Sequence, residues 1–210
     1  MPVTTPAGDT GGADLALAAA LAAYAAGAAT EHAVLTAVAA SRLLVPVVAV
    51  LAEAGADGTE KETEMALPTL IGNDGRKAVI AFTSTETVRR WRADARPVPV
   101  TAPRLWPAVA AEQADAVVID VAGPVPLVVE GARLRALASG APPPLPHEDP
   151  DIRAQVAAVA ADFTLEPGNE DAELTITLKA ADLATARAAA EAIAARLAPR
   201  LRCGIAIRLG

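Results

Sequence analysis

The segment Ala141–Pro150 constrains the architecture of this chain most strongly, because five of its ten residues are proline. Proline fixes φ and lacks a backbone N–H, so closely spaced prolines favour an extended, semi-rigid connection. We therefore predict two units, residues 13–140 and 151–210, joined by a linker over residues 141–150. Residues 1–12 are rich in Gly, Thr and Pro, and we predict a disordered tail there.

The first unit mixes helical and strand patterns. Asp14–Ala26 and Thr30–Ala40 are predicted helices, because an acidic residue or a threonine stands at each start and Gly27 follows the first. Asp74-Gly75 predicts a tight hairpin between two apolar runs. The other predicted helices are 83–92, with Thr83 or Ser84 as cap and Glu86 in a capping box, 103–112 and 133–139. The predicted strands are 42–51, 64–71, 77–82, 98–101, 116–121 and 125–130.

The second unit has a more regular pattern. Ile152, Val156 and Val159 have helical spacing, and 183–197 carries a second apolar helical stripe. Residues 163–165 and 172–179 are predicted strands, the latter half-buried because it alternates without error. Leu201, Cys203 and the apolar residues after them are predicted to share one face of a last strand. We expect an α/β (α+β) protein: a mixed-sheet first unit with packed helices, then a small α-β-β-α-β sandwich.

Charge and cysteine content exclude several partner classes. The formal net charge of −7 disfavours nucleic acid and anionic membranes as main targets. The alanine-rich run 15–29 is too short and too weakly apolar to span a bilayer, and no positively charged start precedes it. A single cysteine, Cys203, excludes an internal disulfide and a multi-cysteine metal site. We expect a soluble, cytoplasmic protein.

The motif search predicts no catalytic, cofactor-binding or metal-binding residue. The chain has no glycine-rich phosphate loop, nucleophile elbow or paired-histidine metal motif. We interpret His32 and His147 as incidental, and Cys203 as a small buried side chain. Asp115 and Asp120 bracket a predicted buried strand, a position where catalytic carboxylates occur, but neither has a recognisable partner. Ser41, Ser84 and Ser139 are interpreted as helix-end residues.

One local feature departs from the global acidity. Five arginines (Arg89, Arg90, Arg92, Arg96 and Arg104) surround a single acid, Asp94. One interpretation is a solvated helix face with paired arginines; the other is a surface for an acidic protein partner or a small anion, with Arg89, Arg92 and Arg96 as candidate binding residues. Trp91 follows Val88 by three positions, so we predict a core anchor.

An ordered series of segments resembles the N-terminal domain of the SseB family, named for enhanced serine sensitivity. The series consists of Arg42-Leu-Leu-Val-Pro-Val, Glu64-Met-Ala-Leu-Pro, Asp74-Gly-Arg, Ala81-Phe-Thr-Ser, Trp91, Ala95-Arg-Pro-Val-Pro and Ala114-Asp-Ala-Val-Val-Ile-Asp120. The resemblance spans about residues 13–140, and the last 60 residues resemble the smaller C-terminal domain of that family. It implies a bacterial α/β protein with no established enzymatic mechanism.

Two classes of function stay open at this point. The first is a non-enzymatic cytosolic binding or regulatory module that acts through a protein surface. The second is an enzyme or a sensor of a small metabolite, with an amino acid suggested only by the family name. The missing motifs favour the first class. The sequence does not identify a partner, a ligand or an oligomeric state.

Overall fold

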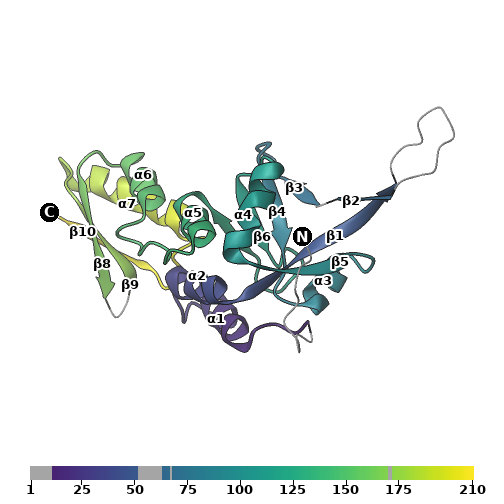
Figure 1. Ribbon diagram of the computed structural model, residues 1–210. Helices are drawn as coiled ribbons and strands as arrows, with labels where there is room; N and C mark the ends of the chain where they lie inside the picture. Colours follow the sequence, from purple (N-terminus) through teal and green to yellow (C-terminus); the bar gives the residue numbers. More distant parts are fainter. Residues whose placement is uncertain (1–10, 52–62, 67, 170–171) are drawn as a thin grey trace.

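The computed structural model describes residues 11–51, 63–66, 68–169 and 172–210. Figure 1 shows an elongated molecule, with the C-terminal residues at one end and the strand pair β1–β2 projecting from the other. Helices and mixed sheets confirm the predicted α/β class. Most of the predicted disordered tail, residues 1–10, lies outside the described residues.

The helices are α1 (Leu15–Ala25), α2 (Glu31–Ala40), α3 (Thr85–Trp91), α4 (Ala102–Ala111), α5 (Gly131–Ser139), α6 (Pro150–Ala157) and α7 (Leu183–Leu197). The strands are β1 (Arg42–Leu51), β2 (Thr63–Ala66), β3 (Thr69–Ile71), β4 (Lys77–Ala81), β5 (Arg96–Thr101), β6 (Ala116–Ile119), β7 (Leu127–Glu130), β8 (Phe163–Asn169), β9 (Ala172–Leu178) and β10 (Ile205–Leu209).

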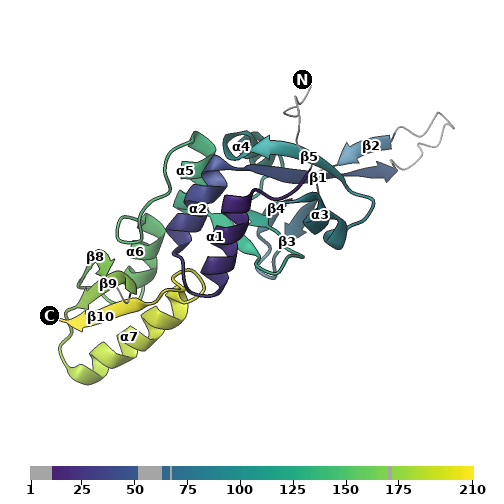
Figure 2. The same cartoon turned by 90° about the horizontal axis from the view of Figure 1, so that it is seen from below.

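The first two helices begin where side-chain caps predict. The Asp14 carboxylate accepts a hydrogen bond from the Leu17 amide at 3.0 Å, and the Thr30 hydroxyl accepts one from the Ala33 amide at 3.2 Å. Each bond satisfies an amide that has no partner within its helix. Gly27, with φ +70°, supplies the left-handed backbone that follows α1. Figure 2 shows α1 and α2 side by side.

The central sheet has the strand order β3-β4-β6-β7, and only β4 and β6 run parallel within it. One face packs on α1, α2, α4 and α5 in the largest apolar core, where Val79, Val117 and Val129 meet helix residues such as Leu17 and Leu105. The opposite face, with Ile80, packs with Val88 of α3. Helices therefore cover the sheet on both sides.

A second sheet has the order β2-β1-β5 and joins the first through a bridge between Leu44 and Phe82. Leu44 exchanges both backbone hydrogen bonds with Phe82, so its N–H points away from β5. Its β5 partner Pro99, and the pair Pro46–Pro97 two residues on, therefore occupy non-hydrogen-bonded positions. The prolines remove no N–H from the β1–β5 ladder, which explains how β1 accommodates Pro46.

The structure corrects the hairpin region. The single strand predicted over residues 64–71 is two strands, because β2 pairs with β1 and β3 pairs with β4 in the other sheet. Gly75 has φ +79°, which confirms the predicted turn conformation. Ser84 caps α3, but its capping-box partner is Thr87, so the prediction of Glu86 was wrong. The Glu86 side chain pairs with Arg90 instead.

The C-terminal residues form the predicted α-β-β-α-β order, with a sheet ordered β10-β9-β8 around a separate apolar core. The last strand begins only at Ile205, so Leu201 and Cys203 precede it, and the predicted strand face for these two residues was wrong. β9 is buried on both faces rather than half-buried, since Glu173 and Thr175 are as enclosed as Leu174 and Ile176. The face of β9 that carries Glu173 and Thr175 is therefore covered as well.

The proline-rich segment has no helix or strand between Gly140 and Pro150. It is not fully exposed, because Pro143 and Asp149 are buried. Asp149 caps α6 by accepting a hydrogen bond from the Asp151 amide at 2.8 Å. The division into two units at residues 141–150 stays a prediction.

Candidate functional site

The basic segment lies on α3 and the strand that follows it. Ser84 fixes the start of α3, and Val88 is fully buried beneath it. Trp91 packs against Phe82 with ring centroids 5.7 Å apart, and both rings belong to the same apolar cluster. Trp91 is thus the predicted core anchor. Its contact with Phe82 anchors the end of α3, the helix that carries Arg89.

The three predicted binding residues, Arg89, Arg92 and Arg96, are all exposed. The Arg92 Nε donates to the Asp94 carboxylate at 2.8 Å, and this contact lowers the pKa of Asp94. Arg89 and Arg96 have no ion pair within the part of the chain that the structure describes. The solvated-face interpretation therefore describes Arg92 well, and leaves two cations free.

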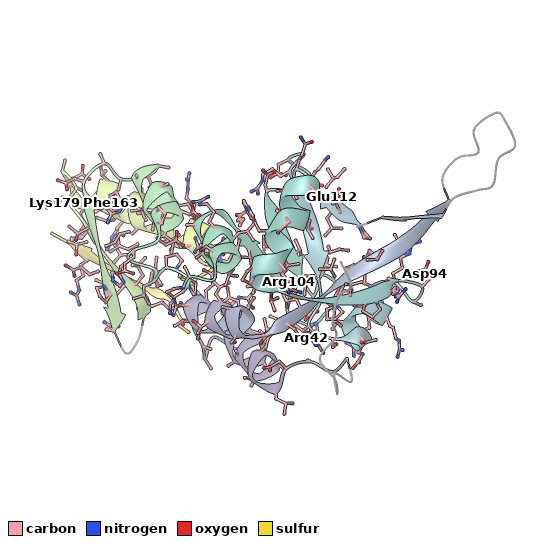
Figure 3. All side chains as sticks on the ribbon, viewed as in Figure 1. Arg42, Asp94, Arg104, Glu112, Phe163 and Lys179 are labelled. Carbon is pink, nitrogen blue, oxygen red and sulfur yellow. The ribbon has the colours of Figure 1, made fainter. Side chains whose placement is uncertain are left out.

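The two other arginines of the basic segment, Arg90 and Arg104, contribute less to a common positively charged surface than the sequence indicates. Arg90 forms an ion pair with Glu86 one helical turn away. Arg104 lies at the start of α4, at the far end of β5 from Asp94, as Figure 3 shows. We define the basic face as Arg89, Arg92 and Arg96. The net positive charge of the basic face comes from Arg89 and Arg96, because Arg92 is paired with Asp94.

The strand next to this face cannot easily take up another strand. β5 is an edge strand of its sheet, and the outward-facing backbone positions include Pro97 and Pro99. Neither residue can donate an N–H to an incoming strand, which is a known protection of sheet edges. Recognition at this edge therefore depends on side chains.

Asp120 occupies the carboxyl ends of the parallel strands β4 and β6. It is buried, and its two oxygens accept hydrogen bonds from the Thr83 amide at 2.9 Å and the Thr83 hydroxyl at 2.7 Å. Its φ of +52° is unusual for a residue other than glycine, although aspartate tolerates it better than most. The carboxylate holds the start of α3 against β6.

A cavity of about 240 Å³ lies beside Asp120 and is lined mainly by apolar atoms of α1 and the 124–125 turn. Ser84, Thr87 and the Glu86–Arg90 pair complete its lining. No histidine or cysteine lines this cavity, and Asp115 lines a different one. The structure therefore does not bring Asp115 and Asp120 together as an acid–base pair.

The other residues considered from the sequence have local roles. Ser41 and Ser139 donate to helix carbonyls three or four residues earlier, as helix-end residues do. The His32 ring nitrogen lies 3.4 Å from the Pro144 carbonyl oxygen. His147 lies beside Glu148 at 3.8 Å. Within the described ranges, no three His, Cys, Asp or Glu side chains are placed to hold a metal ion.

Sequence reasoning missed a buried ionic cluster that joins the two ends of the chain. Arg133 Nη1 donates to Glu31 at 2.5 Å, and Arg200 donates to Glu31 at 2.9 Å and to Asp149 at 2.6 Å. Burial alone would lower the pKa of Arg200, but its hydrogen bonds to Glu31 and Asp149 outweigh burial and raise it. The cluster contains two cations and two anions, so its formal charge cancels.

Tyr24 extends this contact region. Its hydroxyl donates to the carbonyls of Pro199 and Arg200 at 3.1 and 2.9 Å. The Arg202 guanidinium lies 4.7 Å from the ring centroid, a cation–π distance. Burial raises the pKa of Tyr24, so the hydroxyl remains a hydrogen-bond donor at neutral pH. No local signal predicts these contacts, because the residues are more than a hundred positions apart in the sequence.

Comparison with known proteins identifies one family. The family model described as SseB protein N-terminal domain matches residues 17–136. No curated protein and no solved structure matched the chain. The match includes β1, the hairpin, α3 and β6, which carry the resemblance seen in the sequence. It ends before α6, and it leaves the assignment of the C-terminal residues as a prediction. No helix among the described residues is long and apolar enough to cross a membrane.

Proposed function

Because this chain belongs to the SseB family, for which the sequence resemblance implies no established enzymatic mechanism, we propose that it is a non-enzymatic binding or regulatory module. We place it in the bacterial cytoplasm. It acts through the basic face formed by Arg89, Arg92 and Arg96, and its partner presents acidic side chains.

The observation that carries this proposal is a pair of exposed arginines, Arg89 and Arg96, that have no ion-pair partner among the described residues of a chain with net charge −7. A cation that serves only solubility gains nothing from a fixed support. Here the Phe82–Trp91 contact fixes the backbone beneath the arginines. Arginine also binds carboxylates through a planar fork of donors, which favours an acidic protein surface.

The hydrogen bonds of Asp120 favour a structural role for this buried carboxylate. Both oxygens of Asp120 are already engaged by Thr83. In this arrangement Asp120 fixes the start of α3, and so it contributes to the rigidity of the basic face.

The test compares two variants of equal charge change. Arg89→Glu, Arg92→Glu and Arg96→Glu are combined in the first variant. The control combines Arg187→Glu, Arg196→Glu and Arg208→Glu, three exposed arginines of the C-terminal residues. Both variants must keep the wild-type melting temperature. Partners captured by the wild type from a bacterial lysate are then quantified at several salt concentrations.

The proposal predicts that the first variant loses partners that the control retains, and that these partners dissociate from the wild type as salt rises. Equal capture by both variants, with unchanged salt tolerance, would show that the basic face is only a solvated surface. The proposal would then be wrong.

A further inference from the structure

The structure contains a second candidate site, independent of the basic face, where the C-terminal residues meet the SseB-like domain. A cavity of about 500 Å³ is lined by α4, α5 and α6 together with Arg200. Its lining includes Trp106, which is 42% exposed, and the exposed Arg135. Arg135 has no ion pair or hydrogen bond among the described residues. Both parts of the chain contribute residues to its lining.

The N-terminus of α5 opens into this cavity and already holds a carboxylate. The Ala132 amide donates to Asp151 Oδ2 at 2.8 Å. Gly131 permits this approach, because a Cβ at that position would clash with the same oxygen. Glu130, which precedes α5, makes no side-chain cap. The first turn of α5 is therefore capped by a residue from α6, and its positive end stabilises the negative charge.

Two arginines that line the cavity each have one unsatisfied buried donor within the described part of the chain. The Arg133 side chain is only 5% exposed and lines the cavity, yet its Nε has no acceptor among the described residues. The same holds for Nη1 of Arg200. A buried donor without an acceptor is unfavourable, so an additional acceptor near these guanidinium groups is favoured.

The local charge balance determines how an external anion could bind. Three acids, Asp115, Glu130 and Asp151, line the cavity along with its arginines. Glu130 is engaged by Arg76 at 2.6 Å. Asp151 is thus the acid that stands directly on the helix N-terminus, and an added anion must replace it there rather than join it.

From this geometry we infer that the cavity is a binding site for a small molecule that carries a carboxylate or phosphate group, and that Asp151 is its built-in competitor. The anionic group of the ligand takes the place of the Asp151 carboxylate at the N-terminus of α5, next to Arg135. The rest of the ligand packs against Trp106. Displacement of Asp151 removes one of the contacts that dock α6 on α5, so binding loosens the contact between the two parts of the chain.

A tethered carboxylate competes at an effective concentration of the order of millimolar. The wild type should therefore bind a simple anion weakly, and removal of the Asp151 charge should strengthen binding about tenfold or more. Asp151→Asn is the informative variant, because the amide oxygen can still accept from Ala132. Asp115→Asn is the matched control: it removes the same charge from the same cavity but does not touch the helix N-terminus.

The full chain is titrated with inorganic phosphate and, separately, with acetate, at constant ionic strength set with sodium chloride. The fluorescence of Trp106 is followed in a Trp91→Phe background. A saturable response to either anion, tighter in Asp151→Asn than in Asp115→Asn and lost in Arg135→Gln, supports the site, and the responding anion identifies the ligand group. Arg89→Gln should leave the titration unchanged, which separates this site from the basic face.

Equal strengthening by Asp151→Asn and Asp115→Asn would reduce the effect to overall charge and overturn the proposal. So would a response that is not saturable. If Asp151→Asn fails to fold, the amide resonance of Ala132 in the wild-type protein provides the second measurement. It should shift saturably with millimolar phosphate or acetate, and an Ala132 resonance that stays unchanged contradicts displacement.

Discussion

Glu173 is the buried acid whose surroundings are least favourable to its charge. It is 8% exposed, Oε1 accepts from the Cys203 amide at 2.9 Å, and Oε2 has no donor among the described residues. Burial is the main cause that raises the pKa of Glu173, and the nearby Glu31 adds to it. A raised folded-state pKa means that this carboxyl group stabilises the fold below its unfolded pKa, and that the contribution is lost as pH rises through the folded value.

We therefore expect Glu173→Gln to stabilise the protein at pH 7 by about 1 kcal/mol, because a neutral amide is less costly to bury than a carboxylate. The glutamine oxygen can still accept from Cys203. The advantage over the wild type should shrink as pH falls through the raised folded-state pKa of Glu173 towards the ordinary pKa of glutamate, because Glu173 itself becomes neutral in the folded protein. Denaturant unfolding between pH 4 and pH 8 measures this difference. A gap that is constant across this range would contradict the assignment.

Cys203 lies in the turn before β10, partly exposed, with Sγ 3.3 Å from the Gly27 carbonyl oxygen. Burial, reinforced by Glu173, raises the pKa of its thiol, so little of the reactive thiolate forms at neutral pH. We expect slow reaction of the native protein with a thiol reagent, and a loss of about 1 kcal/mol in Cys203→Ala. Labelling as fast as that of the unfolded chain would show that Cys203 is not structural.

At the scale of single elements, the sequence predicted best where the determining residues are adjacent. Asp14 and Thr30 cap their helices because side chain and amide are three positions apart. The division of residues 63–71 into β2 and β3 could not be predicted, since the partners β1 and β4 belong to different sheets. The basic segment was visible as a cluster of arginines, but which of them lack partners depended on Asp94 and Glu86 in three dimensions.

Substitutions in the turn of the β3–β4 hairpin test its left-handed backbone conformation. Gly75 has φ +79°, and a Cβ there would meet no atom within 4 Å. Any loss in Gly75→Val is therefore backbone strain and not a clash. A β-branched residue in the left-handed region should destabilise the protein by more than about 1 kcal/mol. Gly75→Asn, which tolerates that region, should cost clearly less in the same chemical denaturation experiment. Equal stability of both variants would imply a rearranged turn.

At the scale of the whole molecule, the contact between the two ends of the chain could not be predicted. Glu31 lies in the first turn of α2, where an acidic residue is ordinary, and nothing in its neighbourhood indicates Arg200, 169 residues away. The proline-rich segment predicts where along the chain one unit ends and the next begins. The spacing of its prolines carries no information about how the two units dock on each other. The burial of these charged side chains follows from tertiary contacts, which the sequence pattern does not contain. The residues concerned are Glu31, Arg133, Arg200 and Asp149.

Removal of the Arg200 side chain tests the contact between the two ends of the chain. Truncation of one member of a buried ion pair leaves an uncompensated charge, at a cost of about 3–5 kcal/mol. Arg200→Ala should therefore weaken the docking of the C-terminal residues, because Glu31 and Asp149 both lose a donor. Arg187→Ala, an exposed arginine of α7, is the matched control and should have little effect.

Limited proteolysis tests the docking and the division of the chain together. We expect the first cut within residues 141–148, where Leu145 and Glu148 are exposed. The two wild-type fragments should elute together in gel filtration, since the contacts of Glu31 and Tyr24 with Arg200 do not depend on an intact linker. The fragments of Arg200→Ala should separate, and those of Arg187→Ala should not. A first cut within residues 68–130 would refute the two-unit division, whereas wild-type fragments that separate at once would show that the ionic cluster does not hold the units together.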